Sequence, residues 1–347
     1  MAGPDTHASL LERFREGKAV ALARAISVVE DERPGFQELL HALLARGPRA
    51  VRVGLTGPPG AGKSSLLAAL AGVYRGREEH LGIVAVDPTS PYSGGALLGD
   101  RIRMSELATD PDVFIRSMAS RGSSGGLAAT TKEVLDLMDA FGFDRILIET
   151  VGVGQTELEI TAAADTVVVV LVPESGDAIQ AMKAGLMEIA DVFVVNKADR
   201  PGSARLVKEI KQSLHLRAGR ALEDVPAHHG VDLGRRARPA DRPAEPQQAL
   251  WDVPVLTSNA LTEEGLGDVV TAIDEHRTWL ETSGALAVRR RARAGVRVRD
   301  VVERGLRRAA WASDSVRASL EGGLDRIEAG EGTPYSVAQE ILGLLLR

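Results

Sequence analysis

The sequence has no cysteine among its 347 residues, and aromatic side chains make up only 3% of the chain. Without thiols the chain forms no disulfide, and it has neither a thiolate metal ligand nor a nucleophilic thiol. Because Phe, Trp and Tyr are scarce, most of the core must be built from Val, Leu, Ile and Ala. Thiol-dependent catalysis and thiolate metal sites are therefore excluded.

The sequence also lacks a long apolar run and an excess of positive charge. The longest apolar run, residues 166–173, is far too short to span a bilayer. Residues 2–20 are polar and mixed in charge, unlike a signal peptide. The net charge of −6 gives no overall basic field for nucleic acid. These absences predict a soluble, cytoplasmic protein that binds neither membrane nor nucleic acid.

The most informative stretch reads G-P-P-G-A-G-K-S at residues 57–64, a full match to G-x-x-x-x-G-K-[ST]. Residues 51–56 are rich in β-branched side chains, as in a buried strand, and residues 66–70 are good helix formers. In that context the glycines bring backbone N–H groups onto a phosphate chain, Lys63 reaches the β- and γ-phosphates, and the Ser64 hydroxyl binds Mg²⁺. The residues that this motif predicts to bind nucleotide are Gly57, Pro58, Pro59, Gly60, Ala61, Gly62, Lys63, Ser64 and Ser65.

Two further predicted strands carry acidic residues at or near their ends. Residues 81–87 finish at Asp87, and Glu149 lies next to the end of a later strand. The segment 88–104 is rich in Pro, Ser and Gly and contains Asp100. Long loops in compact domains are usually functional, so we expect both aspartates within reach of the phosphate site. The alternative interpretation is solvated surface charge.

Glu149 is followed three residues later by Gly152, an order typical of a γ-phosphate sensor. In that arrangement the acid holds the Mg²⁺ shell, and the glycine N–H bonds the γ-phosphate. Val153 stands where signalling GTPases have a water-orienting glutamine, and Gln155 lies two residues later. For Gln155 a catalytic role and a structural role are both open.

A strand predicted at residues 191–196 ends in N-K-A-D. Asn196 can hydrogen-bond the Hoogsteen edge of guanine, and Lys197 can lie over the plane of the base. Asp199 can accept from N1–H and the exocyclic amine, a donor pair that adenine lacks. The tetrapeptide therefore predicts guanine as the base.

The last core strand and the loop beyond it are predicted at residues 253–260. Such a loop normally lines the far side of the base through backbone N–H groups, so we expect Ser258, Asn259 and Ala260 to contact guanine. Together these motifs predict GTP and GDP as ligands and Mg²⁺ as the cofactor.

Predicted strands alternate with helices through the middle of the chain, which indicates an α/β fold with a mostly parallel sheet flanked by helices. Ligands bind at the carboxyl ends of such strands, where the motifs converge. We predict a helical extension at residues 1–48, a P-loop nucleoside-triphosphatase core at 49–280 and a helical region at 281–347. Residues 217–248 are rich in Arg, Pro, Ala and Gly and predict a flexible insert in the core.

The flanking regions are predicted from helical periodicity. Residues 8–27 and 34–46 read as two amphipathic helices ahead of the first core strand. Residues 285–347 read as helical, with basic stretches that we interpret as solvated helix faces.

The motifs together resemble one family. G-P-P-G-A-G-K-S, D-P-T-S-P-x-S-G-G-A-x-L-G-D-R-I-R-M, E-T-V-G-V-G-Q, K-A-G-x-M-E-I-A-D and N-K-A-D are similar to the MeaB/ArgK family over most of residues 35–280. Members are G-protein chaperones of adenosylcobalamin-dependent acyl-CoA mutases. The resemblance implies that Asp87, Asp100 and Glu149 join Ser64 around Mg²⁺. It also implies a C-terminal dimerisation arm, and so a homodimer.

The resemblance further implies an additional switch loop at residues 174–185. There Asp177 and Lys183 would rearrange when the mutase docks, and Lys183 would stabilise charge that develops on the γ-phosphate. Two departures from the family pattern are Glu174-Ser175, where we expect glycine, and the Thr257-Ser-Asn-Ala260 run. With Lys63 and Gln155 from the motifs above, the candidate catalytic residues are Lys63, Lys183, Asp177 and Gln155.

The resulting hypothesis is a GTPase of low intrinsic rate that binds a mutase of the methylmalonyl-CoA mutase type and gates cofactor loading or protection. A nickel-delivery GTPase is one alternative, but it needs Cys or His ligands, and the chain has no cysteine. A P-loop kinase of a transport system is another, for which no acceptor site or catalytic base is evident.

Overall fold

The computed structural model describes residues 4–44, 47–87, 107–119, 129–150, 160–174, 185–217 and 251–346 of the protein. The chain divides into two compact units, Met1–Ala287 and Val288–Arg347. Among the described residues, no helix has both the length and the apolar character needed to cross a bilayer.

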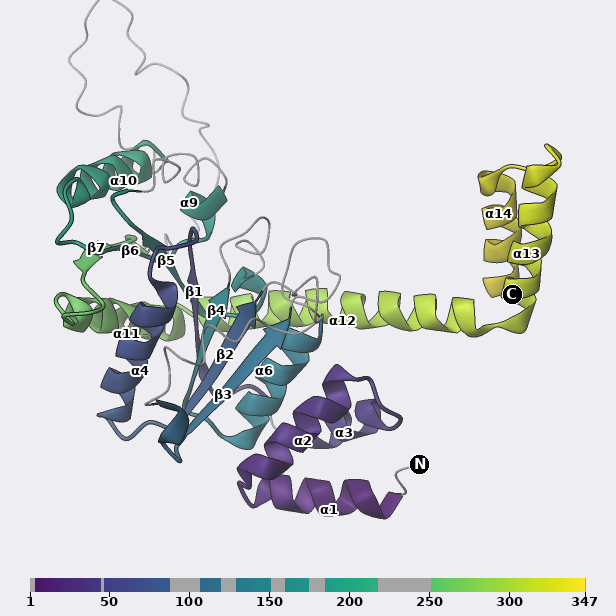
Figure 1. The fold of residues 1–347 in the computed structure, drawn as a ribbon, viewed down its shortest axis with the longest axis horizontal. Coiled ribbons are helices and arrows are strands. Elements are labelled where there is room, and N and C mark those ends of the chain that lie inside the picture. The colour runs from purple at the N-terminus through teal and green to yellow at the C-terminus, as the bar shows by residue number, and fades with distance from the viewer. Residues whose placement is uncertain are drawn as a thin grey trace, which may run out of the picture. The chain divides into compact units, whose positions relative to one another are not determined.

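The first unit is built on a seven-stranded sheet with strand order β3-β2-β4-β1-β5-β6-β7 (Figure 1). Every neighbouring pair is parallel. The central strands are buried along their length, as a parallel sheet covered on both faces requires. The predicted α/β fold is therefore confirmed. The strands are β1 (Val51–Thr56), β2 (Leu81–Asp87), β3 (Val113–Ala119), β4 (Arg145–Thr150), β5 (Thr166–Leu171), β6 (Val192–Asn196) and β7 (Val255–Ser258).

The register brings the carboxyl ends of the strands to one edge of the sheet. Glu149 on β4 is level with Leu55 on β1 and with Ala85 on β2. Asn196 at the end of β6 is level with Ser258 at the end of β7. The loops that follow β1, β4, β6 and β7 therefore start side by side, where ligands bind in such folds.

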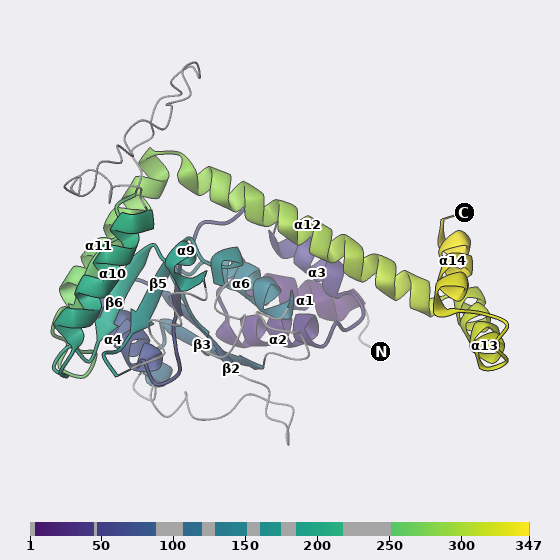
Figure 2. The ribbon, with the colours of Figure 1, turned by 90° about the horizontal axis from the view of Figure 1, so that it is seen from above.

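Helices cover both faces of this sheet (Figures 1 and 2). On one face, α4 (Lys63–Arg75) and α11 (Leu266–Thr282) bury their apolar residues against the strands. On the other face lie α6 (Ala129–Phe141), which packs against the N-terminal helices, and α10 (Ser203–Arg217), which packs against β6 and β7. The short elements are η2 (Leu107–Thr109), η3 (Ile160–Ala162) and α9 (Met187–Ile189).

The N-terminal residues form three helices, α1 (Pro4–Arg15), α2 (Ala19–Glu30) and α3 (Phe36–Leu43). The prediction of one helix over residues 8–27 was wrong, because Gly17 has a φ of +74° and interrupts the helix between α1 and α2.

These helices share the core of the first unit. The ring of Phe14 packs edge-on against Phe141 of α6, with centroids 5.1 Å apart. Glu30 of α2 forms an ion pair with Arg116 of β3, and α2 lies along α6 (Figure 2). The N-terminal extension is therefore packed onto the nucleoside-triphosphatase core.

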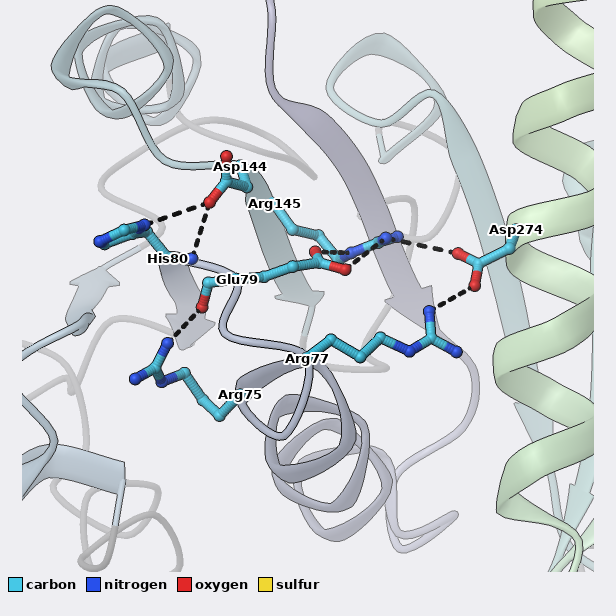
Figure 3. Close-up of polar contacts among 7 residues, drawn as sticks. All are labelled: Arg75, Arg77, Glu79, His80, Asp144, Arg145 and Asp274. Atoms are coloured by element: carbon cyan, nitrogen blue, oxygen red, sulfur yellow. Dashed lines mark hydrogen bonds and ion pairs between the residues drawn. The ribbon is translucent and has the colours of Figure 1, made fainter.

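A polar network holds the opposite edge of the sheet, where the strands begin (Figure 3). Arg145, at the start of β4, is bonded to Glu79 at 2.8 Å and to Asp274 of α11 at 3.3 Å. Its guanidinium lies 3.7 Å from the ring centroid of Tyr74, and burial raises the pKa of that phenol. Arg77 donates to the same Asp274 at 2.7 Å. These contacts join α4, β4 and α11 far from the carboxyl edge and have a structural role.

The second unit contains most of α12 (Ala285–Ala312), together with α13 (Asp314–Glu328) and α14 (Pro334–Leu345). The last two pack as a helical hairpin around Val316, Val337 and Ile341. A Cβ at Gly323 would lie 2.4 Å from the Val337 side chain, so glycine permits this close packing. The prediction of a helical C-terminal region is confirmed.

Candidate functional site

The loop after β1 has the backbone that its glycines predict. Gly57, Gly60 and Gly62 all have left-handed φ values, of 137°, 76° and 84°. A Cβ at Gly57 would lie 2.0 Å from the Val170 carbonyl oxygen, and one at Gly62 would lie 2.4 Å from Nδ2 of Asn196. Both conformation and space therefore require glycine at these two positions.

Helix α4 begins at Lys63, directly after the loop, with Gly62 as its N-cap residue. The free N–H groups of its first turn and the positive end of its dipole point toward the loop, which is the arrangement of an anion-binding helix N-terminus. The Lys63 ammonium donates to the carbonyl oxygens of Gly57 at 2.9 Å and Pro58 at 3.1 Å. The cation is thus buried inside the loop that is predicted to hold phosphate.

Two of the predicted metal ligands meet beside this loop. The Ser64 hydroxyl donates to Oε1 of Glu149 at 2.7 Å, and both side chains are buried. A hydroxyl and a carboxylate are oxygen ligands of the kind that Mg²⁺ prefers. Asp87 ends β2 at the same edge of the sheet, one strand from β4. The donor set fits the predicted ion.

A contact that the sequence analysis missed fixes the neighbouring strand ends. Thr150 donates to the hydroxyl of Thr56 at 3.1 Å, and both residues are buried. The pair joins β4 to β1 immediately before the glycine loop, and so fixes Glu149 relative to it. No local pattern marks these threonines, since they are 94 residues apart.

Asn196 joins the phosphate loop to the loop after β7. Its Nδ2 donates to the Ala61 carbonyl at 2.9 Å, and its Oδ1 accepts from the Ala260 N–H at 3.1 Å. The residue is 2% exposed. An amide has two N–H donors and two acceptor lone pairs, so bonds to a base remain possible alongside these.

The rest of the N-K-A-D turn lies against the same loop. Lys197 has a φ of +56°, and its ammonium donates to the Gly60 carbonyl at 2.9 Å. The Ala198 N–H donates to the Ser258 carbonyl at 3.1 Å. Asp199 is exposed at the end of the turn. The structure therefore brings the predicted phosphate and guanine residues together at the carboxyl edge.

The loop after β7 lies next to Asp199. Asn259 donates from Nδ2 to Oδ1 of Asp199 at 2.9 Å, a side-chain contact that the sequence analysis did not predict. Ser258 is 1% exposed, so its side chain faces the interior. The N–H groups of Asn259 and Ala260 donate to Glu264 and Asn196. The loop is thus held by bonds within the protein.

The departure from the family pattern at Glu174 has a partner. Its carboxylate forms an ion pair with Arg200, the residue after Asp199. Hydrogen bonding to this carboxylate raises the pKa of Arg200. The start of the predicted switch segment is therefore joined to the residue that follows the N-K-A-D turn.

Several predicted residues lie outside the described part of the chain. They are Asp100, Gly152, Gln155, Asp177 and Lys183, together with the side chain of Asp87 and almost all of the 217–248 insert.

A glycine loop that opens a helix, a buried Ser–Glu pair and an N-K-A-D turn, all at the carboxyl edge of a parallel sheet, define a P-loop GTPase. A family model described as "Methylmalonyl Co-A mutase-associated GTPase MeaB" matches residues 22–315, and the chain belongs to this family. The predicted family and the predicted GTPase activity are both confirmed.

Two curated relatives of the chain are also named GTPases. A putative GTPase of Pyrococcus abyssi is 42% identical over 335 residues, which cover 96% of this chain and 95% of the relative. GTPase ArgK of Escherichia coli is 33% identical over 293 residues, which cover 82% and 80%. A crystal structure titled as an LAO/AO transport system kinase superposes over the whole of both chains, with a TM-score of 0.66 and 25% identity.

Proposed function

We propose that this GTPase binds an adenosylcobalamin-dependent acyl-CoA mutase of the methylmalonyl-CoA mutase type and couples GTP hydrolysis to cofactor loading or protection. The observation that carries the proposal is the match to a family described as mutase-associated over residues 22–315. The site geometry supports its enzymatic half, since the phosphate and guanine motifs lie at one edge of the sheet.

In this proposal, different residues of the chain bind the phosphates, hold the metal ion and select the base. The glycine loop and the start of α4 hold the phosphates, and Lys63 adds its positive charge. Ser64 and Glu149, with Asp87 and Asp100 as further candidates, would hold Mg²⁺. Bound Mg²⁺ supplies positive charge against the β- and γ-phosphates. Asp199 selects guanine.

We further propose that hydrolysis is slow until the mutase docks. Val153 replaces the water-orienting glutamine of signalling GTPases, so positioning of the attacking water must come from elsewhere. Gln155, Asp177 and Lys183 are the candidates, with Lys183 as the cation that stabilises the transferred phosphoryl group.

Adding purified methylmalonyl-CoA mutase is expected to raise the single-turnover rate of GTP hydrolysis, and Lys183→Ala to remove most of the increase. A cation supplied to the transferred phosphoryl group contributes up to roughly 10³–10⁵-fold in rate. Lys208→Ala, at an exposed lysine of α10, is the matched control and should keep full stimulation. Absence of both binding and stimulation would reject the mutase partner. Full stimulation of Lys183→Ala would reject only the role of Lys183.

We also propose that the second unit mediates homodimerisation. Val298, Val302 and Leu306 recur every four residues on α12 and are all exposed. Leu344 and Leu346 near the C-terminal end of the hairpin are exposed as well. Exposed apolar side chains that recur along one helix in this way are typical of an interface.

Sedimentation equilibrium is expected to give about twice the chain mass of 36.8 kDa. Leu306→Asp should shift the protein toward monomer because it places a charge in the apolar stripe. Arg307→Asp introduces the same side chain at the adjacent exposed position and should leave the mass unchanged. A monomeric wild type, or equal effects of the two variants, contradicts the proposed interface.

A further inference from the structure

We propose that Asn259 is a positioning residue for base recognition: its side-chain amide orients the Asp199 carboxylate and so sets the preference for guanine. The inference rests on the proposed guanine site. It is carried by the hydrogen bond from Nδ2 of Asn259 to Oδ1 of Asp199, at 2.9 Å, between residues that are 60 positions apart.

The direction of the amide follows from a second contact. Oδ1 of Asn259 accepts from the backbone N–H of Leu261 at 3.1 Å. A backbone N–H can only donate, so the atom that faces it must be the amide oxygen. The NH₂ group of the same amide then has to face Asp199, where a donor meets a carboxylate. The reversed amide would oppose donor to donor and oxygen to oxygen.

The backbone that carries Asn259 is fixed before any ligand binds. Its N–H donates to the Glu264 carbonyl at 2.9 Å, and the N–H of Ala260 donates to the buried Asn196 at 3.1 Å. Gly265 closes the loop with a φ of +73°, and a Cβ there would lie 2.2 Å from the Thr257 carbonyl oxygen. The backbone of Asn259 is therefore rigid, so little conformational entropy is lost when its amide holds Asp199.

Asp199 itself needs such a support because it is exposed. A solvated carboxylate samples several rotamers, whereas recognition of N1–H and the exocyclic amine requires both oxygens to meet both donors at once. One bond from Asn259 fixes the plane of the carboxylate. It occupies one lone pair of Oδ1 and leaves acceptor capacity on both oxygens for the base.

The test compares GDP with inosine diphosphate, which keeps N1–H and lacks the exocyclic amine. Their ratio of Kd values, measured by calorimetry with Mg²⁺, reports two-point recognition by Asp199. Asn259→Ala is expected to reduce this ratio roughly three- to tenfold, mainly through weaker GDP binding. Asn259→Asp should reduce it further, because a like charge then faces Asp199. This variant keeps the acceptor for the Leu261 N–H, so it also serves if Asn259→Ala does not fold.

A purely structural role of Asn259 would weaken both nucleotides equally and leave the ratio intact, which would overturn the inference. In an Asp199→Ala background the Asn259→Ala change should no longer alter the ratio, and an undiminished effect there would also overturn it. Leu261→Ala, at an 86% exposed neighbour, is the control and should keep the wild-type ratio. If the wild type itself fails to separate the two nucleotides, the guanine-reading role of Asp199 fails first.

Discussion

Glu149→Gln is expected to lower the rate of Mg²⁺-dependent GTP hydrolysis by at least about 100-fold while GTP binding changes much less. Removing a group that only supports a metal ligand already lowers metal affinity or activity about 10–100-fold, and we propose Glu149 as a direct member of the Mg²⁺ site. The substitution keeps an oxygen that can accept from Ser64, now at 2.7 Å, and removes only the charge. The buried pair should therefore persist in the variant, so that a lost rate reports the charge. Single-turnover hydrolysis against Mg²⁺ concentration, with GTP affinity measured separately, checks this.

Glu79→Gln provides the matched control for that experiment. Glu79 lies at the opposite edge of the sheet, where it pairs with Arg145 (Figure 3). The same change of side chain there should lower thermal stability and leave the rate per folded molecule at the wild-type value. Equal rates for Glu149→Gln and the wild type, with an unaltered Mg²⁺ requirement, would falsify the placement of Glu149 at the metal.

The strands were predictable because a parallel sheet buries them on both faces. The apolar run at residues 166–173 contains β5, and the β-branched run at 51–56 forms β1. A strand that is covered on both sides shows a continuous apolar run, which sequence reading detects directly. The glycine loop was predictable for a related reason, since its conformation depends on residues within the motif itself.

The helix break at Gly17 shows what periodicity misses. Apolar residues at helical spacing run from α1 into α2, so the two helices read as one. The left-handed φ of Gly17 and the extended backbone of Lys18 separate them. A glycine inside a helical pattern is a weak signal, because many helices tolerate it at a cost of about 1 kcal/mol.

The supporting contacts of the site could not be predicted in the same way. Lys197 bonds Gly60 across 137 positions, and Asn259 bonds Asp199 across 60. Both contacts depend on the order and register of strands that are distant in the chain, and no local spacing encodes these. The motifs therefore predicted which residues bind nucleotide, whereas the structure shows which contacts hold those residues in place.

Asp199→Asn is expected to weaken GDP binding roughly 10²–10⁴-fold, because two hydrogen bonds to a charged group, each worth about 1.5–3 kcal/mol, are lost. It should also favour xanthosine diphosphate, whose C2 carbonyl replaces the guanine amine.

The neighbouring Asn259 decides this outcome. Its Nδ2 donates toward position 199, so the new amide must turn its oxygen to Asn259 and its NH₂ to the base. Calorimetry with both nucleotides measures the effect, and Asp268→Asn, at an exposed carboxylate in the first turn of α11, is the control. If Asn259→Ala is added, the new amide loses this constraint and part of the xanthosine preference should disappear with it. A variant that keeps the wild-type preference for GDP would remove Asp199 from the base site.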